Sequence, residues 1–422
     1  MQITHAGELA YAFGYVGEYS DNIRRTPTDA QSEWINSAIA GIAYRENGPA
    51  LDAHLLAQAE YRDYKKDTYN VGPLYYADAS FLWRIAPQRL SWVLVDRYDQ
   101  ITRDITLPGT PENLVNSNVL NTGPDLFIRL GQGNTLVLEL RYGNASYSEL
   151  DLDNSRYGTS VRWLYAVNTE MTYSLNYQAE QIMYENEILN DNTQRQDYFI
   201  RVERREARAR FLLDLGFTQI DRDHAGEANG PAVRLTWAEQ LTSESSAGIQ
   251  IASEYLDAGT ALLSTATNLT PAPGPTPSST TAGEPTSDLF YMKRAEVFYA
   301  LGGGNFGTNL RAYYRDIDYE IAPLDRKEGG GRLDITYNPS SVLATTVYGS
   351  HLDVQYQSFS RDDRENEAGI RFLYRINSNV SATLDGRKTW RYSTDALQEY
   401  IDKRVLFSLR YSSSPLVTTI GR

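Results

Sequence analysis

The chain has 422 residues, a formal net charge of −14, 31 tyrosines, four histidines and no cysteine. The lack of cysteine excludes disulfides, thiolate metal sites and cysteine nucleophiles, and the acidic balance argues against a nucleic-acid partner. No run approaches the roughly 18 apolar residues of a membrane helix. We predict no metal site and no cofactor.

Apolar residues recur with a period of two, which is typical of β-strands rather than helices. In residues 136–142, Leu136, Leu138 and Leu140 share one face, while Glu139 and Arg141 share the other. The same alternation occurs in 211–217, 332–337, 370–376 and 404–411. A soluble β-sandwich shows this pattern with its apolar face inside, and it stays open as an alternative that predicts a protein monomeric without detergent.

Two features favour a transmembrane barrel over a sandwich. The apolar face often ends in an aromatic residue, as at Tyr142, Trp163, Tyr165, Tyr177, Trp237, Tyr299, Tyr337, Tyr374 and Tyr411. Such rings suit the two membrane interfaces. Tight turns, for example 47–49, 131–134 and 377–379, alternate with longer polar loops at 21–33, 65–73, 102–118, 147–156, 184–197, 221–231, 256–288, 320–331, 357–367 and 393–402. Short turns and long loops form the two ends of an outer-membrane barrel.

Ten loops and nine turns predict a single all-β domain over 1–422, an antiparallel barrel of about 20 strands with both termini on the periplasmic side. The strands are expected to start near residues 8, 34, 51, 74, 90, 119, 135, 156, 171, 197, 209, 232, 247, 289, 306, 331, 342, 368, 380 and 403. The alternation is weak in 90–100 and ambiguous in 34–45, so 18 strands is the alternative count.

The predicted location is the bacterial outer membrane, with its lipid and lipopolysaccharide as surroundings. The chain opens Met1-Gln2-Ile3-Thr4-His5, without a charged n-region or an apolar h-region. We therefore interpret the sequence as a mature form with an added initiator methionine.

One segment differs in composition from the rest. Residues 264–288 are rich in Pro, Thr and Ser and cannot bury enough apolar area to order themselves. We predict that 256–288 is the longest extracellular loop. It is expected to be a flexible surface segment, with a flap over the pore mouth or a surface epitope as the alternatives.

The polar face of the strands is predicted to line a hydrated lumen, because 16–18 strands already enclose an aqueous channel. The residues expected along the solute path are Arg62, Arg141, Arg162, Arg311, Arg332, Arg371, Arg375, Arg387, Arg404, Arg410, Glu139 and Asp334. The arginines of the last three strands, including Arg391, form a candidate track for an anionic polymer. The alternative is that these charges pair across strands and only keep the lumen wet.

Catalysis has little support in the sequence. His54 falls on the polar face of the third strand and His351 near the external end of the seventeenth, and neither has a serine at a persuasive spacing. The acidic run 361–367 is expected to be a solvated loop tip rather than a calcium loop. We predict that the protein is not an enzyme.

The first two hairpins carry a specific pattern. Residues 17–23, Gly-Glu-Tyr-Ser-Asp-Asn-Ile, end the first strand; 41–48 close the second with Gly-Ile-Ala-Tyr-Arg-Glu-Asn-Gly; and 59–64 read Ala-Glu-Tyr-Arg-Asp-Tyr. Over residues 8–65 the chain resembles the outer-membrane barrel proteins found with exosortase (PEP-CTERM) and exopolysaccharide gene clusters of Gram-negative bacteria. The resemblance implies a barrel linked to polysaccharide secretion and implies no catalytic residue.

The favoured function is an outer-membrane exit channel for a secreted polysaccharide, without chemistry of its own, served by a periplasmic or inner-membrane export partner that docks at the short turns. The alternatives are a diffusion porin, which should have an inward constriction loop, and a non-conducting surface scaffold, which should have a blocked lumen. An outer-membrane enzyme is the remaining class.

Overall fold

The computed structural model describes residues 7–267 and 285–414, and every strand in it belongs to one sheet. In chain order the strands are β1 (Glu8–Ser20), β2 (Glu33–Asn47), β3 (Leu51–Tyr64), β4 (Leu74–Ala86), β5 (Leu90–Thr102), β6 (Leu114–Gly131), β7 (Asn134–Tyr147), β8 (Asn154–Ala166), β9 (Met171–Tyr184), β10 (Thr193–Arg205), β11 (Ala209–Arg222), β12 (Ala228–Gln240), β13 (Ser245–Leu256), β14 (Phe290–Gly303), β15 (Phe306–Tyr319), β16 (Arg326–Tyr337), β17 (Leu343–Tyr356), β18 (Arg361–Arg375), β19 (Val380–Ser393) and β20 (Tyr400–Ser412). The short helices are α1 (Ala258–Thr267), η1 (Pro111–Asn113) and η2 (Ala396–Gln398).

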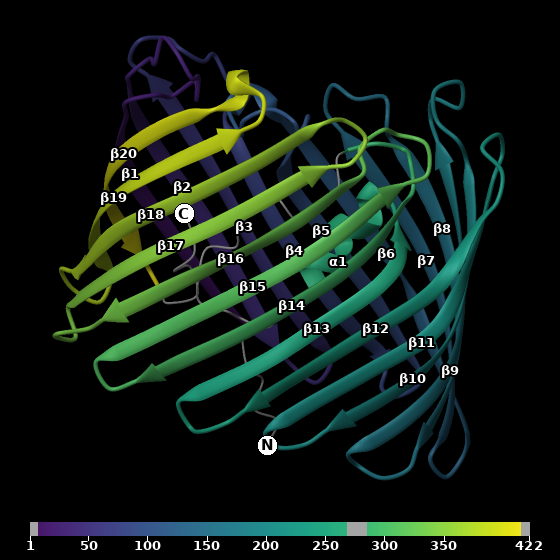
Figure 1. The fold of residues 1–422 in the computed structure, drawn as a ribbon. Helices are drawn as coiled ribbons and strands as arrows, with labels where there is room; N and C mark the ends of the chain where they lie inside the picture. Colours follow the sequence, from purple (N-terminus) through teal and green to yellow (C-terminus); the bar gives the residue numbers. More distant parts are fainter. Residues whose placement is uncertain (1–6, 268–284, 415–422) are drawn as a thin grey trace.

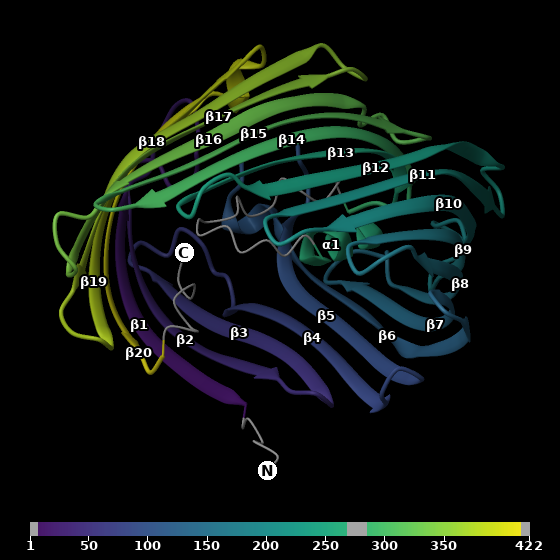
Figure 2. The ribbon, with the colours of Figure 1, turned by 90° about the horizontal axis from the view of Figure 1, so that it is seen from below.

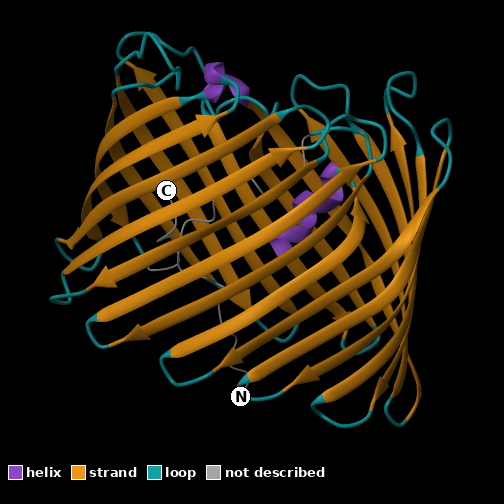
Figure 3. Cartoon of the chain, in the orientation of Figure 1, coloured by secondary structure: helices purple, strands orange, loops and turns teal. Residues whose placement is uncertain are grey.

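The sheet closes on itself. Each strand pairs antiparallel with the next in sequence, and β1 pairs with β20 in a register that joins Ser20 to Arg404 and Ala12 to Ser412. Figures 1 and 3 show the resulting barrel, with short turns at one end and longer loops at the other. Closure removes every sheet edge, as a strand-built membrane span requires. The predicted antiparallel barrel of 20 strands is confirmed.

The apolar face of the strands points outward. In β1, Leu9, Tyr11 and Phe13 are exposed, whereas Ala10 and Ala12, which alternate with them, are fully buried. Exposed aromatic side chains also lie near the short-turn ends of strands, at Trp83, Trp92, Trp163, Tyr173, Phe306, Tyr337 and Tyr374. An apolar exterior with an aromatic girdle is stable only when lipid covers it. The protein is therefore a transmembrane barrel of the bacterial outer membrane. None of the helices described here is long and apolar enough to span a membrane.

Strand starts were predicted to within two residues at the short-turn end, whereas several at the loop end were predicted too late. Residues 8, 51, 74, 90, 171, 209, 306 and 380 each begin a strand as predicted. In contrast, β6, β16 and β18 begin five to seven residues before their predicted starts at 119, 331 and 368. The strands continue past the membrane, where the outward face is polar and the alternation that marks a strand disappears.

The acidic run 361–367 shows this clearly, because its prediction as a loop tip is wrong. It forms the first half of β18, and its register with β17 and β19 is continuous. Arg361 and Asp363 point to the buried face, and Asp362 and Arg364 point outward.

Both segments with weak alternation are strands. In β5, Asp96 shares the outward face with Trp92, where an apolar residue is expected, and its carboxylate accepts a hydrogen bond from Asn118 Nδ2 at 2.9 Å. In β2, the outward face carries the small residues Ala38 and Ala40, while Ile35 and Ile39 lie on the inner face, so the two faces differ little in hydropathy. The count is 20, and the alternative of 18 is excluded.

Part of the segment predicted as an external loop folds inward. Residues 257–267 leave β13 and enter the barrel, where α1 lies inside the ring of strands in both views (Figures 1 and 2). Most of the Pro/Thr/Ser-rich stretch, residues 268–284, falls outside the described residues.

Candidate functional site

The twelve residues predicted along the solute path all lie on the inner face of the barrel. Each alternates with exposed apolar side chains of its own strand; Arg141, for instance, lies between Leu140 and Tyr142. The set comprises Arg62, Arg141, Arg162, Arg311, Arg332, Arg371, Arg375, Arg387, Arg404, Arg410, Glu139 and Asp334. Their contact with a passing solute stays a prediction.

Lumen arginines are paired with carboxylates on the same or neighbouring strands. On β7 and β8, Arg162 Nη2 lies 3.0 Å from Glu139 Oε1, and Arg141 Nη2 lies 2.5 Å from Asp125 Oδ1. On β3, Arg62 Nε lies 2.7 Å from Glu60 Oε1. The first two pairs join neighbouring strands and the third lies within β3; together they leave a polar, zwitterionic wall.

A denser group of charges lines β14 to β19. Arg311 pairs with Glu296 at 3.1 Å, and Arg332 reaches both Asp334 at 2.9 Å and Glu367 at 3.4 Å. The Tyr348 hydroxyl donates to Asp385 at 2.9 Å, and Asp385 also accepts from Arg371. The guanidinium groups of Arg332 and Arg371 lie 4.8 and 5.5 Å from the centre of the Tyr348 ring. Aromatic and charged groups thus hold one another in fixed positions on this wall.

The arginine track predicted on the last three strands exists as a spatial neighbourhood, but most of its charge is compensated. Arg371 pairs with Asp385, and Arg391 pairs with Asp363. Glu18 of β1 accepts from Arg404 at 2.7 Å and lies 3.8 Å from Arg387. Arg375, at the short-turn end, donates to the Ser341 carbonyl at 3.0 Å. Most arginines on this part of the wall are therefore paired with carboxylates, as in the cross-strand alternative, and do not form an open cationic surface.

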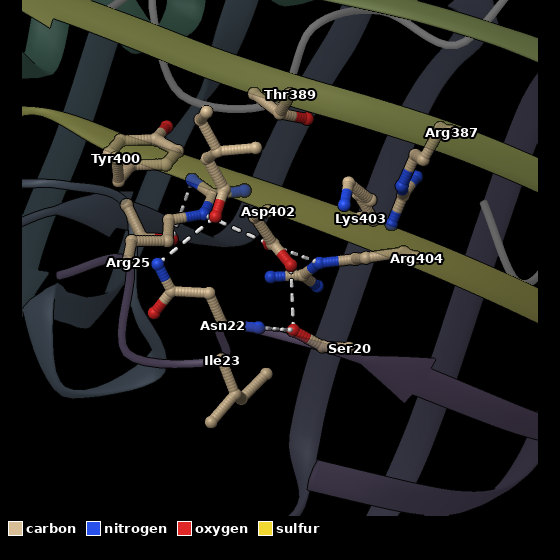
Figure 4. Close-up of polar contacts among 12 residues, drawn as sticks. Ser20, Asn22, Ile23, Arg25, Arg387, Thr389, Tyr400, Asp402, Lys403 and Arg404 are labelled. Atoms are coloured by element: carbon tan, nitrogen blue, oxygen red, sulfur yellow. Dashed lines mark hydrogen bonds and ion pairs between the residues drawn. The ribbon is translucent and has the colours of Figure 1, made fainter. Parts of the chain in front are cut away.

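The barrel seam between β1 and β20 is held by a buried carboxylate (Figure 4). Asp402 has no exposed surface; it accepts from Ser20 Oγ at 2.7 Å and from Arg404 Nε at 2.6 Å. Arg25, from the loop after β1, places its Nε 3.7 Å from the same carboxylate and its guanidinium over the Tyr400 ring.

The segment Tyr19-Ser20-Asp21-Asn22, which is one part of the pattern behind the sequence resemblance, lies at this seam. Asp21 Oδ1 accepts from the backbone N–H of Lys403 at 2.7 Å, and Asn22 Nδ2 donates to the Ile401 carbonyl at 3.1 Å. Together with Ser20, these side chains extend the pairing of the first and last strands beyond the sheet. In this protein the segment has a barrel-closing role.

Helix α1 is anchored inside the barrel by a buried ion pair. Asp257 and Arg156 of β8 form a two-pronged contact, and their side chains are only 3% and 4% exposed. Asp257 Oδ1 also accepts from the backbone N–H groups of Gly259 at 2.9 Å and Thr260 at 3.2 Å, which caps the helix. Arg156 Nη1 donates to Thr260 Oγ1 at 3.1 Å. We call Arg156, Asp257 and Thr260 the α1 anchor.

The ionised form of Asp257 is strongly favoured. Burial by itself would raise the pKa of this carboxyl, but Arg156 and the hydrogen bonds from Thr260 together hold the pKa well below its usual range. The anchor therefore keeps its charge throughout the neutral range.

Two opposite patches of the barrel wall contact α1. Leu262 packs in a cluster with Ile101, Val115, Val119, Ala145 and Tyr147 of β5 to β7. Ala261 packs in another cluster with Leu256, Phe290, Met292, Ile317 and Tyr319 of β13 to β15. The helix thus bridges two walls that are far apart in sequence, and it occupies lumen cross-section between them (Figure 2).

A second segment crosses the extracellular mouth. The loop between β5 and β6, residues 103–113, reaches β17 and β18: the Tyr356 hydroxyl donates to the Ile105 carbonyl at 3.1 Å, and Arg361 Nη2 donates to the Thr106 carbonyl at 2.6 Å. Arg25 Nη1 donates to the Gly109 carbonyl at 3.1 Å. We call residues 103–113 the mouth loop. The mouth loop narrows the extracellular entrance to the part of the lumen that α1 does not fill.

The external end of the barrel is acidic. The nine longer connections other than the one after β13 contain seventeen Asp and Glu residues against five Lys and Arg residues, so negative charge is concentrated there. A ring of one sign at a pore mouth raises the local concentration of the opposite ion.

The histidines occupy different faces. His351 lies on the outward face of β17, and its Nδ1 lies 2.8 Å from Asn366 Oδ1. His54 faces the lumen and lies opposite Ser80 of β4 in the register, a neighbour that the sequence analysis did not find. No hydrogen bond joins His54 to Ser80 in the described part of the chain. Within the same residues, no three His, Asp or Glu side chains are grouped to hold a metal.

Sequence reasoning missed both inward segments. A signal for α1 is present: Asp257 is a good N-cap residue, and Ala261, Leu262 and Leu263 are helix formers. The contacts of the mouth loop have no such signal, because Tyr356 and Arg361 meet backbone carbonyl groups about 250 residues away in sequence.

No protein-family model and no curated protein matches the chain. Among solved structures, OccK2 (OpdF) of Pseudomonas aeruginosa, determined with glucuronate, aligns over 97% of this chain and 98% of its own at 10% identity, with a TM-score of 0.42. A BenF-like porin from Pseudomonas fluorescens Pf-5 aligns over 97% and 99% at 12% identity (TM-score 0.41), and the FrpB iron transporter from Neisseria meningitidis over 95% and 81% at 10% identity (TM-score 0.46). What is similar at this level is the barrel architecture.

Proposed function

We propose that this outer-membrane channel is a diffusion porin for small hydrophilic solutes. The observation that carries the proposal is α1, which lies inside the barrel, bridges two walls and is fixed by the buried Arg156–Asp257 pair. A helix that is anchored in the lumen restricts the solutes that pass by size. This is the inward constriction that distinguishes a porin from an exporter with a wide lumen.

The wall chemistry supports passage of polar solutes. Arginine–carboxylate ladders, such as Arg162 with Glu139 and Arg332 with Asp334, keep the wall wet, and they offer hydrogen-bond partners without a strong net charge. A solute that loses part of its hydration shell finds both donors and acceptors on neighbouring strands. Because most of these charges are paired, binding is weak enough for release.

Polysaccharide export and a surface scaffold require a lumen different from that of a porin. A polymer exporter needs a continuous wide passage, so α1 and the mouth loop would both have to move aside for each chain. A scaffold needs a lumen that conducts no ions. Most lumen arginines are already paired with neighbouring carboxylates. They therefore support a binding track for an anionic polymer less well than unpaired arginines would.

The test is single-channel conductance of the refolded protein in planar bilayers, compared with a variant in which a short Gly-Ser linker replaces residues 258–286. We expect small, stable openings for the natural chain and clearly larger ones for the variant. Equal conductance in both proteins contradicts a constriction by α1. Absence of conductance in both, despite correct insertion, contradicts the porin and favours the scaffold.

A further inference from the structure

A cavity of about 480 Å³ opens at the short-turn end of β9 to β12, away from the lumen site. Its lining includes Val202, Arg204, Ala209, Phe211, Trp237 and Glu239. The volume is within the range of small-molecule and lipid-tail sites, about 300–1,000 Å³.

The register places this cavity on the lipid-facing side of the barrel. Phe211 pairs directly with Arg204 on one neighbour and with Trp237 on the other, so the three side chains form one row. Phe211 also alternates in phase with Leu215 and Phe217, which are exposed on the exterior. Ala209 pairs with Glu239 one step nearer the turn, and its small side chain leaves the row hollow there.

The height of the cavity is that of the inner-leaflet interface. Trp237 lies near the short-turn end of its strand, as do the exposed girdle residues Trp163 and Tyr337 on other strands. The turn 206–208 follows immediately beyond Arg205. The rings of Phe211 and Trp237 therefore border the cavity on the membrane side, and Glu206 and Glu239 border it on the periplasmic side, as at a lipid headgroup boundary.

The charges at the cavity are of both signs. Arg204 forms an ion pair with Glu206, and both side chains are exposed. Glu239 is half-buried, and among the residues that the structure describes its carboxylate has no ion pair or side-chain hydrogen bond. A partly desolvated carboxylate beside aromatic rings favours a cationic partner that can donate hydrogen bonds.

We propose that this cavity binds a zwitterionic phospholipid of the inner leaflet with a primary ammonium headgroup, as in phosphatidylethanolamine. The acyl chain lies along Phe211 and Trp237, the phosphate contacts Arg204, and the ammonium group donates to Glu239. A choline headgroup has no N–H to donate, and a glycerol headgroup has no positive charge for Glu239. The inference is independent of the proposed porin function.

The test is native mass spectrometry of the full-length folded protein in detergent with equal amounts of phosphatidylethanolamine, phosphatidylcholine and phosphatidylglycerol carrying the same acyl chains. We expect one phosphatidylethanolamine to be retained about tenfold over the other two, a difference of about 1.4 kcal/mol, because only its ammonium group can donate a charge-assisted hydrogen bond to Glu239. Glu239→Gln should reduce this preference to near unity.

Two tryptophan substitutions test the position of the site. Ala209→Trp fills the cavity and should abolish lipid retention. Ala382→Trp is the matched control, because Ala382 is another outward-facing alanine near a short turn, between Tyr374 and Leu409 on the neighbouring strands. The Glu239→Gln result decides alone if Ala209→Trp fails to fold. Equal retention of phosphatidylglycerol, no retained lipid, unchanged preference in Glu239→Gln, or loss in both tryptophan variants would overturn the proposal.

Discussion

Replacing Asp257 with asparagine removes one negative charge from the α1 anchor and leaves the rest of the contact nearly unchanged in shape. Asparagine still caps the helix through its side-chain oxygen. Arg156, only 4% exposed, then loses its closest carboxylate. Breaking a buried ion pair from one side costs about 3–5 kcal/mol. Glu180 remains near Arg156, so we expect the lower end of this range, about 3 kcal/mol.

A loss of about 3 kcal/mol corresponds to an approximately hundredfold shift in the equilibrium between docked and released α1. The assay is the ratio of dwell times in the low- and high-conductance levels of single channels, which should fall by this factor in Asp257→Asn. The matched control is Asp191→Asn in the loop after β9, whose carboxylate contacts His224 on the outside. An unchanged dwell-time ratio in a correctly inserted Asp257→Asn protein would refute the anchoring role.

The same anchor gives a pH expectation. The pKa of Asp257 is depressed in the folded state. The free energy that its ionised carboxylate contributes to the docking of α1 is therefore complete above the ordinary carboxyl pKa of about 3.9. This contribution is lost only as the pH falls further, through the depressed pKa. The dwell-time ratio should therefore stay constant between pH 5 and 8. A change of tenfold within that window would mean that another group controls α1.

Four further predictions concern the packing of α1, the mouth loop, the seam and the acidic mouth. The natural chain has no cysteine, so Leu262→Cys introduces a single thiol group. This thiol should react slowly with thiol reagents in the otherwise natural protein and rapidly when Asp257→Asn is also present. Equal reaction rates would contradict the packed position of Leu262. Tyr356→Phe removes one neutral hydrogen bond to the mouth loop, about 0.5–1.5 kcal/mol, and should increase the frequency of brief openings by less than about tenfold. Ser20→Ala should lower the free energy of unfolding in micelles by about 1–3 kcal/mol because it leaves Asp402 with one hydrogen bond fewer at a fully buried site; an unchanged urea midpoint would argue against the seam contact. The acidic mouth should give cation preference in reversal-potential measurements at about 0.1 M salt that weakens at about 1 M, where the Debye length falls from about 10 Å to about 3 Å; anion preference at low salt would contradict it.

Much of the fold could be predicted from the sequence because lipid imposes a strict two-residue pattern on each strand. Leu140 and Tyr142 flank Arg141 in a way that only one register satisfies, so the inner and outer faces follow directly. The pattern is lost where the strands leave the membrane. For that reason the beginning of β18 at Arg361 was assigned to a loop, and its lumen-facing Asp363 was not expected to pair with Arg391.

The candidate site could be predicted only in part. The positions of the lumen charges follow from the strand period, but their pairing depends on the cross-strand register, and so the degree of charge compensation could not be known. The inward path of the α1 segment depends on one contact between Arg156 and Asp257, which are 101 residues apart. A Pro/Thr/Ser-rich neighbourhood concealed the capping residue that begins the helix.

The central claim is that α1 sets a size limit on diffusion through an otherwise wide barrel. The most direct measurement is the rate at which neutral sugars of increasing chain length enter proteoliposomes that contain either the natural protein or the variant lacking 258–286. We predict that entry into the natural protein falls steeply with sugar length and that the variant admits markedly longer sugars. The account is contradicted if the natural protein passes long polysaccharides as readily as the variant does, or if neither protein admits any sugar.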